Sequence, residues 1–250
     1  MNTKKAIVFD FDGVVANTAH ECYIVCVKTF RQMGEEIKDS GANEKKFMIL
    51  RPYVRFADDF YPVMKLIQAG KYVRNITLSN FKNLRKKYDK ESKKFHDIFY
   101  ENREMLKKTG IKKWIALNRS YPGTVSAVRK LSKKYRIMIA TNKDLDSTFR
   151  ILNHLKTGIK RSDIIPKEFS LTKADKIRKI SKKLKIPLKD IIFIEDVLEN
   201  LEEVKKKLPA VKLALVEWGY STPEQRRQAR KMGIKIIRHV DIEQQLEKIL

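Results

Sequence analysis

The chain has 250 residues, of which 42% are hydrophobic, and a formal net charge of +25 at pH 7. No apolar stretch approaches the roughly 20 residues of a membrane span, and the apolar run after Lys4 and Lys5 is too short for a signal peptide. We therefore expect a cytoplasmic protein without a membrane partner, built as one large domain or as a core with an insertion.

The net charge raises the question of a nucleic-acid partner, because basic domains bind phosphate backbones. Lysine outnumbers arginine by 39 to 16, although arginine is preferred for bidentate contacts with phosphates and bases. The positive charge is also spread over the whole chain rather than gathered in one segment. This distribution favours a solvated, lysine-rich surface over a nucleic-acid interface, and its positive field favours anionic substrates.

The first predicted element is a buried strand at residues 6–9 that ends in two carboxylates. Asp10-Phe11-Asp12-Gly13 follows the apolar run directly, so two aspartates lie at the carboxyl end of the strand. Ligands bind at this edge of open parallel sheets. The pattern indicates either a nucleophile beside a general acid or a polar turn in which Gly13 supplies a positive φ.

The following hundred residues have a helical pattern. Apolar residues recur at helical spacing, and the lysines between them fall mostly on the opposite face. Cys22 and Cys26 lie one helical turn apart, which predicts a buried helix face and a reducing compartment rather than a zinc site. Ser79 is placed to cap a further helix. The predicted stripes lie in residues 19–30, 56–67, 81–88 and 95–105.

From residue 120 onward, strands and helices alternate. A turn opens this region, and its predicted elements are helix 125–131, strand 137–140, helices 145–155 and 174–184, strand 191–194, helix 201–208, strand 213–216, helix 224–232, strand 234–237 and helix 242–250. The repeats predict an α/β fold, a Rossmann-like parallel sheet covered by helices on both faces. The core comprises residues 1–16 and 120–250, with residues 17–119 as an inserted helical domain.

Polar residues also follow the second predicted strand. The hydroxyl of Thr141, followed by free backbone amides at the start of a helix, suits the oxygens of a phosphoryl group, although Thr141 or Asn142 could instead cap that helix. Lys173 begins a helix, where a lysine opposes the helix dipole unless an anion meets it. A solvated side chain is the alternative at this position.

An acidic pair, Glu195-Asp196, follows the predicted strand 191–194, with Asn200 four residues beyond Asp196. Carboxylates are hard oxygen ligands of the kind that Mg²⁺ takes in proteins. The pattern therefore indicates a magnesium site, with helix capping as the alternative.

In this order the residues resemble the four motifs of the haloacid dehalogenase superfamily. The resemblance rests on Asp10-x-Asp12-Gly13, Thr141-Asn142, Lys173 and Glu195-Asp196-x-x-x-Asn200. It covers the whole core, and residues 17–119 match the position of the superfamily's helical cap. Three further segments are similar to its phosphoglycolate-phosphatase-like branch: Tyr121-Pro122-Gly123, Thr141-Asn142-Lys143 and Val216-Glu217-Trp218-Gly219-Tyr220.

The resemblance implies phosphoryl transfer through a covalent intermediate. Asp10 would attack phosphorus in line and form an aspartyl-phosphate. Asp12 would protonate the leaving alcohol and then deprotonate the water that cleaves the intermediate. Thr141, the Asn142 amide and Lys173 would bind the phosphoryl oxygens.

The resemblance also implies a magnesium cofactor. Asp10, the backbone carbonyl of Asp12, and Asp196 would hold the ion, which offsets the repulsion between a carboxylate nucleophile and a phosphate dianion. Glu195 would support the metal ligands, and Asn200 would orient Asp196 or the motif lysine.

Some features of the resemblance leave alternatives open. Asp12 favours a phosphate ester, because an alkoxide leaving group needs a proton whereas a halide does not. Val14 stands where such phosphatases often have threonine and sugar-phosphate mutases have valine, and Asn17 stands where aspartate is frequent. Lys167 and Lys176 lie close enough in sequence to replace Lys173 as the phosphate-binding lysine.

We predict a Mg²⁺-dependent phosphatase that hydrolyses a small phosphorylated metabolite, with the oligomeric state left open. The alternatives are a sugar-phosphate mutase and a basic nucleic-acid-binding protein on an inactive core. The candidate substrate-binding residues are Gly13, Asn142, Arg51 and Arg55. Arg51-Pro52-Tyr53-Val54-Arg55 is expected to start a helix, so that both arginines could meet a second anionic group; Arg55 could instead pair with Asp58 or Asp59.

Overall fold

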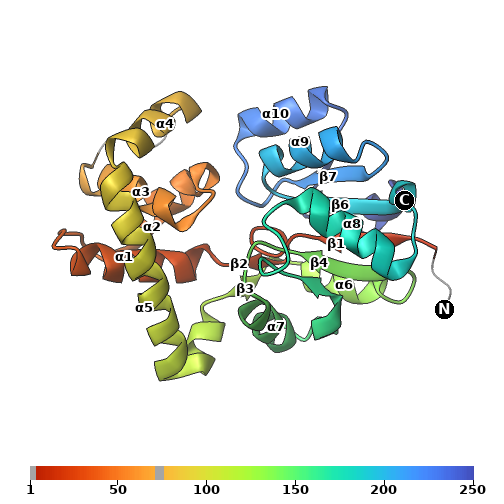
Figure 1. Ribbon diagram of the computed structural model, residues 1–250, viewed down its shortest axis with the longest axis horizontal. Coiled ribbons are helices and arrows are strands. Elements are labelled where there is room, and N and C mark those ends of the chain that lie inside the picture. Colours follow the sequence, from red (N-terminus) through yellow and green to blue (C-terminus); the bar gives the residue numbers. More distant parts are fainter. Residues whose placement is uncertain (1–3, 71–75) are drawn as a thin grey trace. The chain divides into compact units, whose positions relative to one another are not determined.

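The structure is a computed structural model that describes residues 4–70 and 76–250 (Figure 1). Its chain contacts divide it into two units. Unit 1 consists of Met1–Asn17 and Arg119–Leu250, and unit 2 consists of Thr18–Asn118. Each unit has its own core and is described separately below.

Unit 1 is built on a six-stranded sheet. Its strands are β1 (Ala6–Phe9), β4 (Arg136–Ala140), β5 (Ile164–Ile165), β6 (Ile191–Glu195), β7 (Lys212–Val216) and β8 (Lys235–Ile237). They are all parallel, in the order β5-β4-β1-β6-β7-β8, and Figure 1 shows β1 between β4 and β6. The predicted parallel sheet is confirmed. The two-residue strand β5 was not predicted, because so short a run carries no periodicity.

Helices cover both faces of this sheet. They are α6 (Thr124–Leu131), α7 (Leu145–His154), α8 (Lys173–Leu184), α9 (Leu198–Lys207), α10 (Pro223–Lys231) and α11 (Ile242–Glu247). Because side chains alternate along a strand, Val8 packs on one face among buried residues of α8 and α9. Phe9 and Ile194 face the opposite side, where they line a small void with residues of α6 and α11. The sheet is therefore the middle of three layers.

The chain reverses its direction of travel across the sheet at β1. From β1 it proceeds to β4 and β5 on one side, and it then returns to β6, β7 and β8 on the other. The carboxyl ends of β1 and β6 thus meet at the point where ligands bind in such sheets. Beside this edge, β2 (Ala16–Asn17) pairs antiparallel with β3 (Arg119–Ser120), a pair that the sequence pattern did not reveal.

Within residues 18–70 and 76–118, unit 2 contains helices and no strand. Its α-helices are α1 (Ala19–Gln32), α2 (Gly41–Leu50), α3 (Phe60–Gln68), α4 (Leu78–Lys87) and α5 (Asp89–Ala116), with 3₁₀ helices η1 (Arg51–Tyr53) and η2 (Ala57–Asp59). Buried aromatic rings hold them together, including contacts of Phe60 with Phe47 and Phe99. The prediction that Ser79 caps a helix is wrong, because the hydroxyl of Thr77 accepts the hydrogen bond that begins α4.

One ion pair is buried inside unit 2. Glu21 on α1 accepts hydrogen bonds from Arg103 Nε (2.9 Å) and Trp114 Nε1 (3.0 Å), both on α5. All three residues are buried, and the Arg103 guanidinium lies 5.8 Å from the centre of the Trp114 ring. Cys22 and Cys26 are also buried on α1, as predicted. The pair therefore joins the two longest helices of unit 2 through charge as well as packing.

Candidate active site

Asp10 is the first residue after the central strand β1. Its backbone N–H donates to the carbonyl of Ile194 at 2.8 Å, which continues the pairing of β1 with β6 by one residue. Its carboxylate is buried and lies 2.6 Å from Lys173 Nζ. The strand register therefore places this carboxylate at the edge where the sheet changes direction.

Asp196 and Glu195 lie beside Asp10 at the end of β6. One carboxylate oxygen from each of the three residues falls within 4.8 Å of the other two, and all three side chains are buried. Hard oxygen ligands from several carboxylates fit Mg²⁺, so the donor set suits the expected cofactor. Two adjacent strands thus bring together three of the four predicted metal ligands, all except Asp12.

Backbone and side-chain donors orient these two acidic residues. Tyr220 N–H donates to Asp196 Oδ2 at 2.6 Å. Glu195 Oε1 accepts from the N–H groups of Asp196 and Val197, and Asn200 Nδ2 donates to Glu195 Oε2 at 3.1 Å. Asn200 was expected to orient Asp196 or Lys173, but its hydrogen bond goes to Glu195. Helix capping does not explain the pair, because α9 begins at Leu198 with Val197 as its cap.

Lys173 is the lysine that contacts this cluster. Its Nζ lies 2.6 Å from Asp10 Oδ1 and 3.2 Å from Glu195 Oε2, and it donates to the Ala140 carbonyl at 2.9 Å. Burial opposes the charged form, but the charges of Asp10 and Glu195 prevail and raise the pKa of Lys173 above its ordinary value. This placement favours Lys173 over Lys167 and Lys176 as the lysine beside the nucleophile.

The negative charge of the cluster exceeds what Lys173 neutralises. Burial, and then the charge of Glu195, raise the pKa of Asp10 to about 8, although Lys173 opposes this shift. Burial also raises the pKa of Glu195. A divalent cation would favour the ionised carboxylates and lower both values. The electrostatics of the edge therefore favour a bound cation.

Asp12 lies two residues beyond Asp10, in the turn that follows β1. Its Oδ1 is 3.2 Å from Lys143 Nζ, and its side chain is partly exposed while that of Lys143 is buried. A carboxylate at this place can reach both solvent and a bound ligand, as a general acid must. Sequence reasoning did not single out Lys143 as its partner.

Two glycines allow the backbone to approach Asp196 closely. Gly13 has a φ of +82°, and a Cβ there would lie 2.0 Å from Asp196 Oδ2. A Cβ on Gly219 would lie 2.2 Å from Asp196 Cβ and 2.6 Å from the Gly13 carbonyl. The structure thus places Gly13, a predicted substrate-binding residue, against an acidic side chain. Gly219 also leaves room for Asp196. It was not predicted as a site residue, and only its position in the segment after β7 could have suggested it.

Thr141 and Asn142 follow β4 at the same edge. Capping does not account for them, because Asp144 caps α7 by accepting from Ser147 N–H. Thr141 is buried, and its hydroxyl accepts from Lys143 N–H at 3.0 Å. The Asn142 Oδ1 accepts a hydrogen bond from Lys176 Nζ. Both residues thus lie in the segment between the end of β4 and the start of α7.

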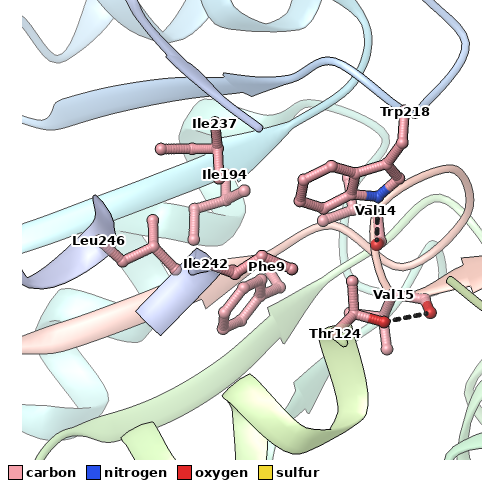
Figure 2. A pocket seen from close by; sticks show the side chains of 9 residues that line it. All are labelled: Phe9, Val14, Val15, Thr124, Ile194, Trp218, Ile237, Ile242 and Leu246. Atoms are coloured by element: carbon pink, nitrogen blue, oxygen red, sulfur yellow. Dashed lines mark hydrogen bonds between the residues drawn. The ribbon is translucent and has the colours of Figure 1, made fainter. Parts of the chain in front are cut away.

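The loop that carries Asp12 is fixed by two side chains from elsewhere in unit 1. Trp218 Nε1 donates to the Val14 carbonyl at 3.1 Å, and Thr124 Oγ1, which donates to the Tyr121 carbonyl at 2.7 Å, also makes a long contact of 3.5 Å with the Val15 carbonyl. Figure 2 shows the contacts with Val14 and Val15 beside an apolar void of about 10 Å³. So small a void holds at most one water. It therefore belongs to the packing beneath the loop and is not a ligand site.

Arg51 and Arg55 lie in unit 2. The prediction that one helix carries both residues is wrong. Only Arg51–Tyr53 is helical, as the 3₁₀ turn η1, and Val54 is extended. Arg51 Nη1 donates to the Val54 carbonyl at 3.2 Å, and Arg55 Nη1 donates to the Pro52 carbonyl at 2.7 Å. Helical spacing therefore does not put the two guanidinium groups on one face.

No helix within residues 4–70 or 76–250 has both the length and the apolar character needed to cross a bilayer. The comparison with curated proteins gave no match.

Solved structures with the same fold come from several bacteria. A haloacid dehalogenase-like family hydrolase from Streptococcus pneumoniae is 15% identical, with a TM-score of 0.65 over 99% of this chain and 100% of its own. A predicted phosphoglycolate phosphatase from Haemophilus somnus is 15% identical, with a TM-score of 0.62 over 98% of both chains. A family hydrolase from Deinococcus radiodurans, solved with bound phosphate and sodium, is 12% identical, with a TM-score of 0.58 over 100% of this chain and 97% of its own.

A family model extends the comparison from fold to sequence. The model for haloacid dehalogenase-like hydrolases matches residues 4–206, which include β1, β4, α8 and β6 with the polar residues at their ends. The motif order and the geometry of the sheet edge agree with this match. The chain therefore belongs to the haloacid dehalogenase-like hydrolase family.

Proposed function

We propose that the protein is a Mg²⁺-dependent phosphatase that hydrolyses a small phosphomonoester through an aspartyl-phosphate intermediate. The observation that carries the proposal is the buried carboxylate of Asp10, set between Lys173 and the acidic pair Glu195-Asp196. The structural neighbours described as phosphatases, and the neighbour with bound phosphate, support the same assignment.

In the first step, Asp10 attacks the phosphorus atom in line and the bond to the alkoxide breaks. Asp12 donates a proton to the departing oxygen, since an alkoxide is a poor leaving group. Lys143, 3.2 Å from Asp12, holds that carboxyl group in the turn. In the second step Asp12 takes a proton from water, which attacks the phosphorus and releases inorganic phosphate from Asp10.

Three groups would bind the phosphoryl oxygens during both steps. Thr141 contributes a hydroxyl, Asn142 contributes its backbone amide, and Lys173 contributes the buried ammonium group. Donors that are fixed before the reaction lower the barrier because they need not reorganise as charge develops. Magnesium held by Asp10, the Asp12 carbonyl and Asp196 would supply further charge stabilisation, with Glu195 supporting these ligands.

We further propose that residues 17–119, which contain the whole of unit 2, form the cap domain that selects the organic group of the substrate. The groups assembled at the sheet edge recognise phosphate and metal, so they cannot distinguish one phosphomonoester from another. Arg51 and Arg55 are the candidates to bind a second anionic group of the substrate. Each guanidinium group donates to a different backbone carbonyl, so the two would bind separately and not as a pair on one helix face.

A panel of phosphorylated metabolites tests the function. The wild-type protein with Mg²⁺ should release inorganic phosphate from at least one member, and EDTA should stop the release until Mg²⁺ is restored. Isomer formation from a sugar phosphate without phosphate release would establish the mutase instead. Tight, salt-sensitive RNA or DNA binding without turnover would contradict both enzymes and support the nucleic-acid-binding alternative.

A further inference from the structure

Lys176 is a second buried lysine on α8, three residues after Lys173. Its side chain is fully buried, and its Nζ donates to Oδ1 of Asn142, which follows β4. The phosphatase steps described above use Lys173 and leave Lys176 without a function. Lys176 nevertheless binds Asn142, a residue that we propose to bind the phosphoryl group.

Hydrogen-bond chemistry fixes the orientation of the Asn142 amide. In the structure Lys176 Nζ donates to Oδ1, and in its protonated form the lysine has three donors and no acceptor, so the Nδ2 end of the amide cannot take that place. The Nδ2 group, with its two N–H donors, then points away from Lys176. Asn142 is exposed at the same sheet edge as Thr141, so these donors remain available to an anion.

Burying this ammonium group is costly. Burial, and then the charge of Lys173 on the same helix, lower the pKa of Lys176 to about 7. The charges of Asp10 after β1, Glu195 on β6 and Glu203 on α9 oppose that shift. A methionine would fill a similar volume without any desolvated charge. The lysine is thus poorly explained by packing.

We propose that Lys176 is a positioning residue that holds the Asn142 side chain with its Nδ2 donors toward the phosphoryl oxygens of the substrate. The inference rests on the proposed function, because it adds a residue to the same site. Lys176 itself does not touch the substrate. It acts through one amide: by donating to Oδ1, it leaves the Nδ2 donors free to face an anion.

A double-mutant cycle tests this coupling. Lys176→Met and Asn142→Ala should each lower kcat/KM for a phosphomonoester by about 10- to 100-fold, because each removes the same oriented donor. The kcat/KM of the double variant should be no lower than that of the less active single variant. Lys182→Met, the same change at an exposed place on α8, should stay within about twofold of wild type. Wild-type activity in Lys176→Met, or losses that multiply in the double variant, would overturn the proposal.

Asn142→Asp covers the case in which Lys176→Met does not fold. Aspartate still accepts from Lys176 but has no Nδ2 donor, so this variant should lose as much activity as Asn142→Ala. Full activity in both Asn142 variants would refute the proposal without reference to Lys176. If the wild type hydrolyses no phosphomonoester at all, the proposed function fails instead.

An NMR measurement separates these failures, because it needs no turnover. The side-chain amide signal of Asn142, identified by its loss in Asn142→Ala, should shift when inorganic phosphate is added to the wild type with Mg²⁺. The shift should persist in Lys182→Met and should be lost or reduced at least about threefold in Lys176→Met. An equal response in all three proteins would contradict the positioning function.

Discussion

Two buried ion clusters in this molecule differ in their balance of charge. In unit 2, Glu21 meets Arg103 and the indole N–H of Trp114, so one carboxylate faces one cation. In unit 1, the carboxylates of Asp10, Glu195 and Asp196 lie close together, and Lys173 contacts two of them, those of Asp10 and Glu195. A matched pair is complete within its unit, whereas an excess of buried negative charge favours a ligand that supplies the missing positive charge.

The largest effect should follow from changing Asp10 to Asn. The amide keeps the shape of the side chain but cannot attack phosphorus, so phosphate release should fall by at least about 10³-fold. The protein should remain folded, because below its pKa of about 8 the Asp10 carboxyl group of the metal-free protein is largely uncharged, as the amide is. Steady-state phosphate release and far-UV circular dichroism measure the two effects. Substantial hydrolysis by a highly purified variant would exclude the aspartyl-phosphate mechanism.

In the Glu21–Arg103 pair of unit 2, a change of one partner should lower the stability of the fold. Arg103→Met leaves Glu21 buried without its cation, which should lower the free energy of unfolding by about 3–5 kcal/mol. Urea denaturation measures the loss, and Lys93→Met at an exposed ion pair on the same helix is the control, expected to leave the free energy of unfolding almost unchanged. Similar losses in both variants would show that burial of the pair does not matter.

The pH dependence of stability should separate the clusters further. The pKa of Asp10 is raised to about 8 from 3.8, so between these values the folded metal-free protein holds a proton that the unfolded chain releases. Stability in EDTA should therefore fall as pH rises from about 4 to about 8. Asp10→Asn should flatten this slope, and Mg²⁺ should stabilise the wild type most at the alkaline end. If the urea midpoints of the wild type and Asp10→Asn changed equally with pH across this range, Asp10 would not be the group that causes the slope.

A subtler change tests how the acidic cluster is held. Gly219→Ala places a Cβ within 2.2 Å of Asp196 Cβ, so Asp196 must move. The Mg²⁺ concentration for half-maximal activity should rise by about 10-fold or more, as for other changes that disturb metal-ligand orientation. Gly41→Ala, where a Cβ meets nothing within 4 Å, should leave it unchanged. An unaltered Mg²⁺ requirement in Gly219→Ala would show that Asp196 does not bind the metal.

The smallest expected effects concern the arginines of unit 2. If Arg51 or Arg55 binds a second anionic group, its change to alanine should raise KM for the true metabolite by about 10-fold, equivalent to ~1.4 kcal/mol of binding energy. Hydrolysis of a minimal aryl phosphate should stay almost unchanged. Equal effects on both substrates would show that the arginines support only the local backbone, as their hydrogen bonds to Val54 and Pro52 suggest.

The sequence predicted the sheet and the acidic cluster well, because both depend on local patterns. An apolar strand that ends in carboxylates is visible in ten residues, and parallel strands bring Asp10 and Asp196 to one edge. The contacts of Lys143 with Asp12 and of Trp218 with Val14 could not be predicted in this way. They join residues more than 100 positions apart whose side chains have no periodic signal.

Unit 2 was harder to predict for a related reason. Its helices follow apolar stripes, but α2 has a weak stripe, and the expected helix at Arg51 ends after one 3₁₀ turn. There Asp59 accepts from the backbone N–H groups of Arg55 and Phe56. Local competition between side chain and backbone for hydrogen bonds decided this segment, and helical propensity did not.

The central position of β1 has a consequence for how the protein is made. Ala6 pairs with Arg136 and Ile191, which follow it by 130 and 185 residues. Unit 2 spans Thr18–Asn118, so a chain synthesised from its N-terminus completes that unit before either partner of β1 exists. The strand that leads to Asp10 must wait for both neighbours, and closing such long loops is slow. Nascent chains that end before β6 would therefore contain a finished helical unit but would lack Glu195 and Asp196, and with them the acidic cluster.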